Sequence, residues 1–276
     1  MTGRPLILVT NDDGIASPGL AAAVAAVYDL ADLLVIAPKH QQTGASRNFL
    51  RHPGTRHDET LAIDGQEAPA IAVEASPAQV TRTGIMLFAP RKPELVIAGI
   101  NYGENLGIGV TISGTVGASI EAASLGVPAL AVSLETDIGH HLSHDDAVDF
   151  TTAAVVTRRL VQRILVRPLP AGIDILNVNV PQDATPDTPW RVTRVSRQSY
   201  FHSRVNHDPA KDQPEFVGYE RRVNLETLEP DSDIHALFDG VVSVCPLSID
   251  LTAHRQRPEL ATWLEASNQS SVNSEQ

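Results

Sequence analysis

The chain has few aromatic residues, a single cysteine and a shortage of basic residues. Phe, Trp and Tyr make up only 4% of its 276 residues, so the core must be built from Val, Ile, Leu and Ala. The lone Cys245 excludes an internal disulfide and any zinc or iron–sulfur site with several cysteine ligands, and it fits a reducing compartment. With 21 basic and 33 acidic residues, the net charge of −12 argues against nonspecific binding to a nucleic acid polymer or an anionic membrane surface.

Long apolar runs are also missing. No run approaches the roughly 20 residues needed to span a bilayer, and residues 1–9 lack the apolar stretch of a signal peptide. We therefore expect a cytoplasmic protein with no membrane partner. The hydrophobic share of 42% and the charged share of 20% are typical of a globular protein, and the length suits one large α/β domain.

Short apolar runs alternate with helical patterns along the first half of the chain. Residues 6–9 and 33–36 are continuous apolar runs, and Ser17 followed by Pro18 suits the start of a helix between them. This βαβ pattern predicts a parallel sheet. Further strands are expected at 70–73, 94–98, 129–133, 175–181 and 240–244, and helices at 77–87, 113–125, 145–166 and 258–265. The polar stretch 39–69 is expected to be irregular.

The composition changes after residue 181. Residues 182–235 carry many prolines, charges and isolated aromatics, and the alternation at 191–197 and 215–223 predicts an antiparallel hairpin. We therefore expect one domain over 1–266, with a core at about 1–181 and 236–266 and an excursion at about 182–235. The polar stretch 267–276 is expected to be a disordered tail. The predicted fold is a Rossmann-like, mostly parallel sheet flanked by helices, with the hairpin as an excursion.

Two adjacent carboxylates follow the first predicted strand. Asp12 and Asp13 come where that strand ends, and active sites of open α/β sheets lie at the carboxyl ends of strands. Gly14 permits the turn that lets both side chains reach one ion. Paired carboxylates repel unless a cation or proton lies between them, and oxygen ligands favour Mg²⁺, Mn²⁺ or Ca²⁺. The dipeptide alone fits a solvated turn equally well.

Polar loops follow two further strands. Thr43 and Ser46 can supply a hydroxyl after the second strand, although a surface loop explains them as well. After the strand ending at residue 98, Asn101 and Asn105 lie among several glycines. Residues 113–115, Ser-Gly-Thr, then open an Ala-rich helix whose free N–H groups favour a phosphate. Together these loops suggest metal-assisted attack on a phosphate ester.

Other chemistry-bearing residues fit these patterns less well. His140, His141 and His144 lie close in sequence but lack a zinc-binding pattern, so they are interpreted as solvated loop residues, with His52 and His57 beside another polar loop. Residues around Ser113 do not form the Gly-x-Ser-x-Gly motif of serine hydrolases. Cys245 follows an apolar strand and is expected to be a buried core residue.

Several ordered blocks resemble the SurE survival-protein family. They are LVTNDDGI at 8–15, SPG at 17–19, VIAP at 35–38, QTG at 42–44, AGINYGENLG at 98–107, SGTVGA at 113–118 and NVNVP at 177–181, with a similar stretch at 231–246. The resemblance covers most of the chain. Three positions depart from the usual family pattern: Thr43 replaces Ser, Lys39 replaces Asp, and 75–80 reads ASPAQV where GTPADC is usual.

The resemblance implies a Rossmann-like fold and a metal-dependent phosphatase acting on nucleoside 5′- and often 3′-monophosphates, with short polyphosphate as a further substrate of some members. It implies a homodimer or homotetramer, formed partly through exchanged C-terminal elements. Carried over by position, Asp12, Asp13, Thr43 and Asn101 would hold one Mg²⁺ or Mn²⁺ per subunit.

The predicted catalytic residues are therefore Asp12 and Asp13, one of which would orient or deprotonate the attacking water. The predicted substrate-binding residues are Asn11, Asn105, Ser113, Gly114 and Thr115. Two alternatives stay open. A phosphatase with a covalent aspartyl-phosphate would normally show Asp-x-Asp spacing, which is absent, and a nonenzymatic nucleotide-binding or regulatory protein would have a degenerate site.

Overall fold

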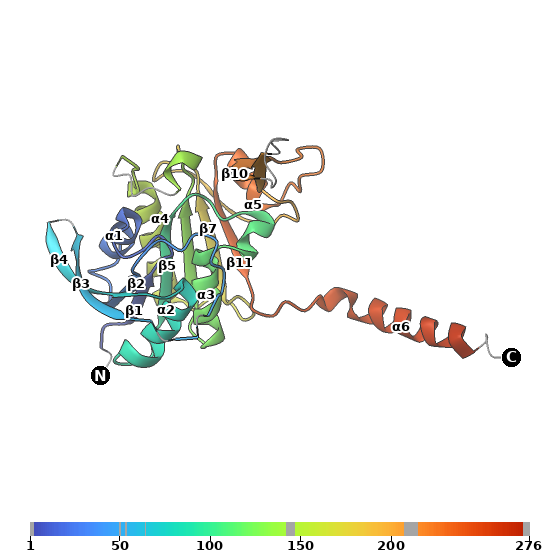
Figure 1. Ribbon diagram of the computed structural model, residues 1–276, viewed down its shortest axis with the longest axis horizontal. Coiled ribbons are helices and arrows are strands. Elements are labelled where there is room, and N and C mark those ends of the chain that lie inside the picture. Colours follow the sequence, from blue (N-terminus) through green and yellow to red (C-terminus); the bar gives the residue numbers. More distant parts are fainter. Residues whose placement is uncertain are drawn as a thin grey trace.

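A nine-stranded sheet forms the centre of the protein in the computed structural model. The structure describes residues 3–49, 51–52, 54–63, 65–141, 147–206 and 215–272, with side chains described as far as residue 265. The strand order is β3-β4-β2-β1-β5-β6-β7-β11-β8, and a second sheet pairs β9 with β10. Figure 1 shows helices on both sides of the large sheet and the last helix, α6, extending away from the body.

The strands are β1 (Leu6–Thr10), β2 (Asp32–Pro38), β3 (Arg56–Ile63), β4 (Gln66–Val73), β5 (Leu95–Tyr102), β6 (Ala129–Leu134), β7 (Ile175–Val180), β8 (Trp190–Val192), β9 (Phe201–Asn206), β10 (Glu215–Arg221) and β11 (Val242–Leu247). The helices are α1 (Pro18–Ala25), α2 (Pro77–Thr83), α3 (Gly114–Ser124), α4 (Thr151–Val166), α5 (Asp233–Phe238) and α6 (Arg257–Val272).

The predicted parallel sheet is confirmed. Neighbouring strands run parallel from β4 through β2, β1, β5 and β6 to β7, whereas β3 and β11 pair antiparallel with β4 and β7 at the two ends of this parallel block. β1, β5 and β6 are buried along their whole length. Burial on both faces explains why these strands read as continuous apolar runs rather than as alternating patterns.

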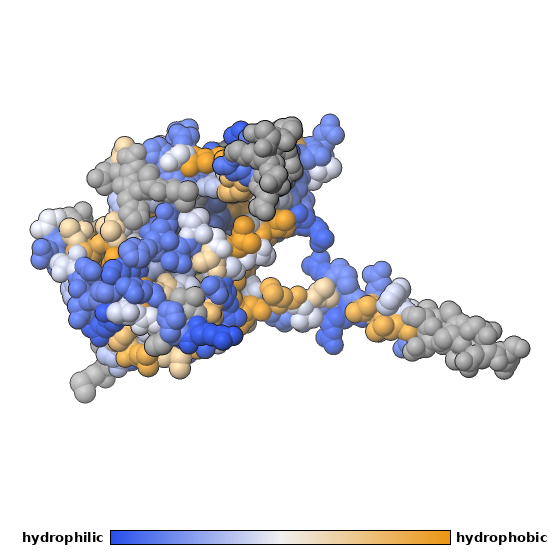
Figure 2. Space-filling model, viewed as in Figure 1, coloured by the Kyte–Doolittle hydropathy of each residue, from blue (hydrophilic) through white to orange (hydrophobic). Residues whose placement is uncertain are grey.

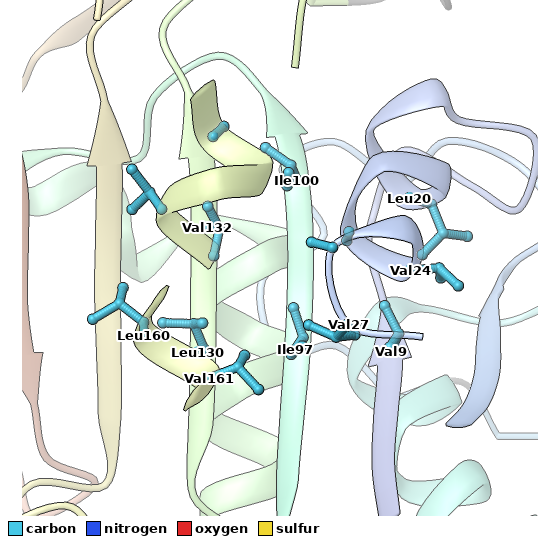
Figure 3. Close-up of a cluster of buried hydrophobic side chains, with 14 of the residues drawn as sticks. Val9, Leu20, Val24, Val27, Ile97, Ile100, Leu130, Val132, Leu160 and Val161 are labelled. Atoms are coloured by element: carbon cyan, nitrogen blue, oxygen red, sulfur yellow. The ribbon is translucent and has the colours of Figure 1, made fainter. Parts of the chain in front are cut away.

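Two apolar layers hold the helices against the sheet. On one face, α1 and α4 pack with the sheet, and on the other face α2 and α3 do so. Figure 3 shows the first layer, in which Leu20 and Val24 of α1 and Leu160 and Val161 of α4 lie against the sheet. Each such side chain contributes about 1.5–3 kcal/mol of burial free energy, so these layers fix the helices relative to the strand ends.

The strand order reverses at β1. The chain continues from β1 to β2 on one side, and β5 pairs with β1 on the other side. The loops after β1 and β5 therefore leave the sheet next to each other and then diverge. In open α/β sheets such a switch point is where ligands bind.

Three local expectations differ from the structure. The stretch 39–69 is not wholly irregular, because β3 forms there as an edge strand whose mostly exposed, charged residues hide it from an apolar pattern. The helix expected at 145–166 begins at Thr151, where the Asp149 carboxylate accepts the Thr151 N–H (2.8 Å); residues 145 and 146 lie outside the described residues. The segment 77–87 is helical, but its last turns at Gly84–Phe88 form a π-helix.

The antiparallel hairpin exists, with a different first strand. β10 pairs with β9, whereas residues 190–192 form β8, which joins the large sheet beside β11. Arg163 of α4 lies 5.3 Å over the Trp190 ring, so contacts with the body place this segment in the large sheet.

The last helix leaves the body as an arm. Figure 1 shows α6 well separated from the sheet, and Figure 2 shows apolar side chains along it. Leu260, Trp263 and Leu264 are more than half exposed on this arm. The helix continues to Val272, into the stretch 267–276 for which the sequence predicts no stable structure. No helix in the described ranges is both long and apolar enough to cross a membrane.

Helix α1 packs closely against the backbone of β5 beside the switch point. A Cβ added to Gly19 would lie 2.0 Å from the Ile100 carbonyl oxygen, which belongs to the strand backbone and has no room to move. We expect Gly19→Ala to lower the free energy of unfolding by about 1–3 kcal/mol in urea denaturation. Gly109→Ala, where a Cβ would meet nothing within 4 Å, is the matched control and should change stability by less than about 0.5 kcal/mol. Equal stabilities for the two variants would contradict the packing constraint.

Candidate active site

Three loops meet at the carboxyl edge of the sheet, around the switch point. Asp12 and Asp13 follow β1, and two backbone groups tie them to the neighbouring strands. The Gln42 N–H, after β2, donates to the Asp12 carbonyl (2.7 Å), and the Tyr102 N–H of β5 donates to Asp13 Oδ2 (3.2 Å). The structure therefore brings together the loops that the sequence singled out separately.

The turn after β1 is shaped by Asn11 and Gly14. The Asn11 side chain accepts the Gly14 N–H (3.1 Å) and donates to the Gly14 carbonyl (3.0 Å). Gly14 has φ of +102°, a conformation that favours glycine, and a Cβ there would lie 3.2 Å from the His40 backbone. The chain leaves the strand at this turn, and Asn11, expected to bind substrate, uses its amide to close it.

The two carboxylates are buried and have different partners. Asp12 is 3% exposed and Asp13 is 1% exposed. Asp12 Oδ1 accepts the Thr115 hydroxyl (2.5 Å), whereas Asp13 Oδ1 accepts the Gln41 side-chain amide (3.1 Å). Gly114 lies so close that a Cβ there would be 2.6 Å from Asp12 Oδ2. Asp12 thus lies against the start of α3, and Asp13 contacts the loop after β2 and the last residue of β5.

Burial makes the ionised forms of both acids unfavourable. Burial raises the pKa of Asp12 to about 6, although the hydrogen bonds from Thr115 oppose the rise. Burial, reinforced by the neighbouring Asp12 charge, raises the pKa of Asp13 well above its usual range. A cation placed between the two carboxylates would relieve both effects, because it favours their charged forms.

Neutral oxygens complete a donor set that suits a divalent cation. Asn101 donates its Nδ2 to the carbonyls of Tyr102 (3.1 Å) and Gly103 (2.7 Å), which leaves Oδ1 to act as a ligand. Thr43 is exposed and directly follows Gln42, which is bonded to Asp12. Two carboxylates with an amide and a hydroxyl oxygen fit Mg²⁺ or Mn²⁺. In the described ranges, no group of three or more His, Cys, Asp or Glu side chains could hold a metal.

The start of α3 faces this acidic pair. Ser113 is the N-cap residue, and its hydroxyl accepts the Val116 N–H (3.1 Å). Gly114 and Thr115 form the first turn, whose N–H groups lack partners from a preceding turn. Asn105 donates its side-chain amide to Ser133 (2.8 Å) and weakly to Thr115 (3.5 Å). The arrangement can hold an anion beside the carboxylates.

Two asparagines of β7 support the site and were not identified as site residues from the sequence. Asn179 Oδ1 accepts the Asn105 N–H (2.7 Å), and the Asn105 carbonyl accepts from the side chains of Asn177 (2.9 Å) and Asn179 (3.2 Å). Both asparagines are fully buried. The sequence did contain a signal for them: two asparagines at alternate positions of an apolar strand. A buried polar side chain needs a hydrogen-bond partner, so such residues point to a polar contact on one face of the strand.

The loop that carries Thr43 is fixed again at its far end. The fully buried carboxylate of Glu121, on α3, pairs with Arg47 (2.7 Å) and with Arg82 of α2 (2.5 Å). Ser46 donates its hydroxyl to the Thr111 carbonyl (2.8 Å), so this second hydroxyl candidate has a structural partner. The ion pairs hold the loop against both helices that cover this face.

The interpretation of His141 as a solvated loop residue is wrong. His141 is 5% exposed, and burial lowers its pKa to about 4, so the ring is neutral near pH 7. His57 lies in a half-exposed cluster with Lys39 and Glu74, and His52 is exposed. His144 lies outside the described residues. Cys245 is buried as expected, and burial raises the pKa of its thiol to about 12.

The fold and this site define a Rossmann-like α/β protein with an acidic, oxygen-rich site beside a helix start at the switch point. The sequence profile described as "Survival protein SurE" matches residues 7–202. The chain therefore belongs to the SurE family.

Solved and curated relatives agree with this assignment. A protein named 5′-nucleotidase SurE from Thermococcus gammatolerans is 39% identical over 90% of this chain and 91% of its own length. Another of that name, from Methanothermobacter thermautotrophicus, is 44% identical over 74% of this chain and 78% of its own. The crystal structure of the SurE protein from Aquifex aeolicus matches with a TM-score of 0.73 and 29% identity, covering 95% of this chain and all of that one.

Removing one buried charge should stabilise the metal-free protein. The pKa of Asp12 is raised from 3.8 to about 6, so its ionisation costs folding free energy that is absent below about pH 4 and complete above about pH 6. We expect Asp12→Asn, measured in EDTA at pH 7.5, to raise the free energy of unfolding by about 1–3 kcal/mol, with the gain disappearing toward pH 4. Asp187→Asn, at an exposed position, is the control. An equal gain in both variants would rule out this explanation.

Proposed function

We propose that the protein is a divalent-metal-dependent phosphomonoesterase that hydrolyses nucleoside 5′-monophosphates to a nucleoside and phosphate. The observation that carries the proposal is the contact between buried Asp12, next to Asp13, and the first turn of α3, which supports a cation site beside an anion site. The name 5′-nucleotidase SurE borne by relatives covering most of the chain supports the same activity. Nucleoside 3′-monophosphates and short polyphosphate belong to the proposal as further substrates.

One cation per subunit is proposed, with Asp12, Asp13, Thr43 and Asn101 as its ligands. Their oxygen donors support Mg²⁺ or Mn²⁺. Such an ion supplies charge to stabilise the phosphoryl group and lowers the pKa of an attacking water. Asn101 is kept in its orientation by the carbonyls that take its Nδ2, and Gln41 does the same for Asp13.

The protein's own groups would then bind and orient the ester. The first turn of α3, at Ser113, Gly114 and Thr115, would hold phosphate oxygens through its N–H groups and the Ser113 hydroxyl, with the Asn105 side chain as a further donor. Water attacks phosphorus in line with the leaving sugar oxygen, so that one P–O bond forms as the ester P–O bond breaks. One of the two carboxylates takes the proton of the attacking water, and the leaving sugar oxygen takes up a proton from solvent to become the nucleoside hydroxyl.

A homodimer or homotetramer in the cytoplasm is part of the same proposal. The arm formed by α6 exposes Leu260, Trp263 and Leu264, and an apolar surface of this kind is usually covered by a partner.

The activity test compares phosphate release from a panel of nucleoside 5′- and 3′-monophosphates and tripolyphosphate with Mn²⁺, with Mg²⁺ and with EDTA. We expect metal-dependent release from 5′-monophosphates, lowered at least about 100-fold in Asp12→Asn because a charged ligand is lost. Asp187→Asn should match the unsubstituted protein. Nucleotide binding without release by the folded protein would instead support a nonenzymatic binding role, and a trapped phospho-enzyme would support the aspartyl-phosphate alternative.

The hydroxyl of Thr43 gives a sharper test of the ligand set. Thr43→Ser keeps the hydroxyl and should leave the Mn²⁺ concentration for half-maximal activity within about threefold, whereas the isosteric Thr43→Val should raise it about tenfold or more. Titration of Mn²⁺ at saturating substrate measures both. Equal behaviour of the Ser and Val variants would remove Thr43 from the ligand set.

A further inference from the structure

The β9–β10 hairpin packs against the active-site loops although it belongs to a separate sheet. Phe201 of β9 and Tyr219 of β10 lie 5.3 Å apart between ring centroids, and both contact the His141 ring, at 5.7 Å and 5.9 Å. Tyr200, which precedes β9, packs with Leu106 of the loop after β5. The hairpin is therefore joined to the body through the segments that border the site.

Arg221 at the end of β10 forms a two-pronged ion pair with the body. Its guanidinium donates to both oxygens of Glu104 (2.7 and 3.1 Å) and to the Thr136 carbonyl (2.5 Å). The Glu104 side chain is fully buried, whereas that of Arg221 is 28% exposed. Burial raises the pKa of Glu104, and the Arg221 charge opposes the rise. Without Arg221, the loop would contain a buried charge without its ion-pair partner.

Glu104 lies between two residues on which the proposed site depends. The preceding Gly103 offers its carbonyl to Asn101, the proposed metal ligand (2.7 Å). The following Asn105 is the proposed phosphate contact. Arg221 therefore fixes, through Glu104, the segment of backbone that aims both asparagines.

Tyr219 reaches the site by a second route. Its hydroxyl lies 2.9 Å from His141 Nδ1, and the His141 ring lies directly over Gly103, where a Cβ would be 2.5 Å from Nε2. The His141 carbonyl accepts the Gln41 side-chain amide (2.7 Å), and the same amide donates to Asp13 Oδ1 (3.1 Å). Tyr219 thus supports the residue that orients Asp13.

We propose that the β9–β10 hairpin acts as a clamp on the active site, with Arg221 and Tyr219 as positioning residues. Arg221 acts through Glu104 on the segment that orients Asn101 and Asn105. Tyr219 acts through His141 and Gln41 on Asp13. The role in catalysis rests on the proposed function. The clamp itself is a property of the fold and has a readout that needs no substrate.

The test uses three variants of the full chain and one control. Tyr219→Phe removes only the hydroxyl. Arg221→Met removes the ion pair and leaves the Glu104 carboxylate buried without its partner. Glu104→Gln combined with Arg221→Met removes both charges. The double variant therefore tests the clamp even where the single variant does not fold. Arg222→Met is the control, because Arg222 is exposed and its guanidinium contacts His202 of the hairpin's own strand β9 (3.1 Å).

Three quantities are measured: hydrogen exchange of peptides covering 39–43 and 99–107, the Mn²⁺ concentration that half-saturates thermal stabilisation, and kcat and KM for a nucleoside 5′-monophosphate. In the double variant we expect the exchange rate of peptide 99–107 and the half-saturating Mn²⁺ concentration each to rise about tenfold. We expect kcat to fall about tenfold, with KM changed less than about twofold. Tyr219→Phe should show smaller changes, with faster exchange in 39–43. Arg222→Met should match the unsubstituted protein.

Unchanged exchange, Mn²⁺ affinity and kcat in the folded variants would overturn the clamp. Faster exchange with unchanged Mn²⁺ affinity and kcat would overturn the positioning role, because the hairpin contact would then serve stability alone. Absence of Mn²⁺ binding and phosphate release in the unsubstituted protein would refute the proposed function instead, and the exchange data would still decide whether the hairpin holds the loops.

Discussion

The site depends on keeping two carboxylates next to each other out of water. Asp12 and Asp13 are adjacent in sequence, both are buried, and burial raises the pKa of each. Much of the surrounding structure limits this cost. Asn11 and Gly14 close the turn that carries both residues, Thr115 and Gln41 each donate to one carboxylate, and α3 begins beside Asp12. The free-energy cost of ionising both carboxylates in the metal-free protein is the same feature that would make a cation bind well there.

The parallel core and the principal site loops were predictable because their signals are local. A strand buried on both faces needs an apolar run, and a turn out of such a strand needs residues such as Asn, Asp and Gly. The edge strand β3 was missed because its polar residues face solvent, and the partner of β10 was misassigned because pairing is decided by contacts with the body. The expectation for His141 failed for a related reason, since nothing near it in sequence shows that β9 and β10 cover it.

The supporting polar groups were harder to predict than the direct candidates. Asp12, Asp13 and Asn101 stand at strand ends, where a ligand is expected. Asn177, Asn179 and Glu104 support the site from within the fold, and their partners are 72, 74 and 117 residues away in sequence. Such pairs become visible only when the sheet order is known. The hairpin depends on the sheet order in the same way, because it contacts the loops that follow β5 and β6.

The loop that carries Thr43 has a fixed span. Its first half is held by the Gln42 N–H on Asp12, and its second half is held by Arg47 on Glu121 and by close packing of Ser46 on Gly117. Only residues 43–45 lie between the anchors at Gln42 and Ser46. An insertion or deletion there could not be absorbed by the surface, as it can in most loops, because either anchor would be pulled from its partner. A change of side chain at constant length, such as one hydroxyl residue in place of another at position 43, leaves both anchors with their partners.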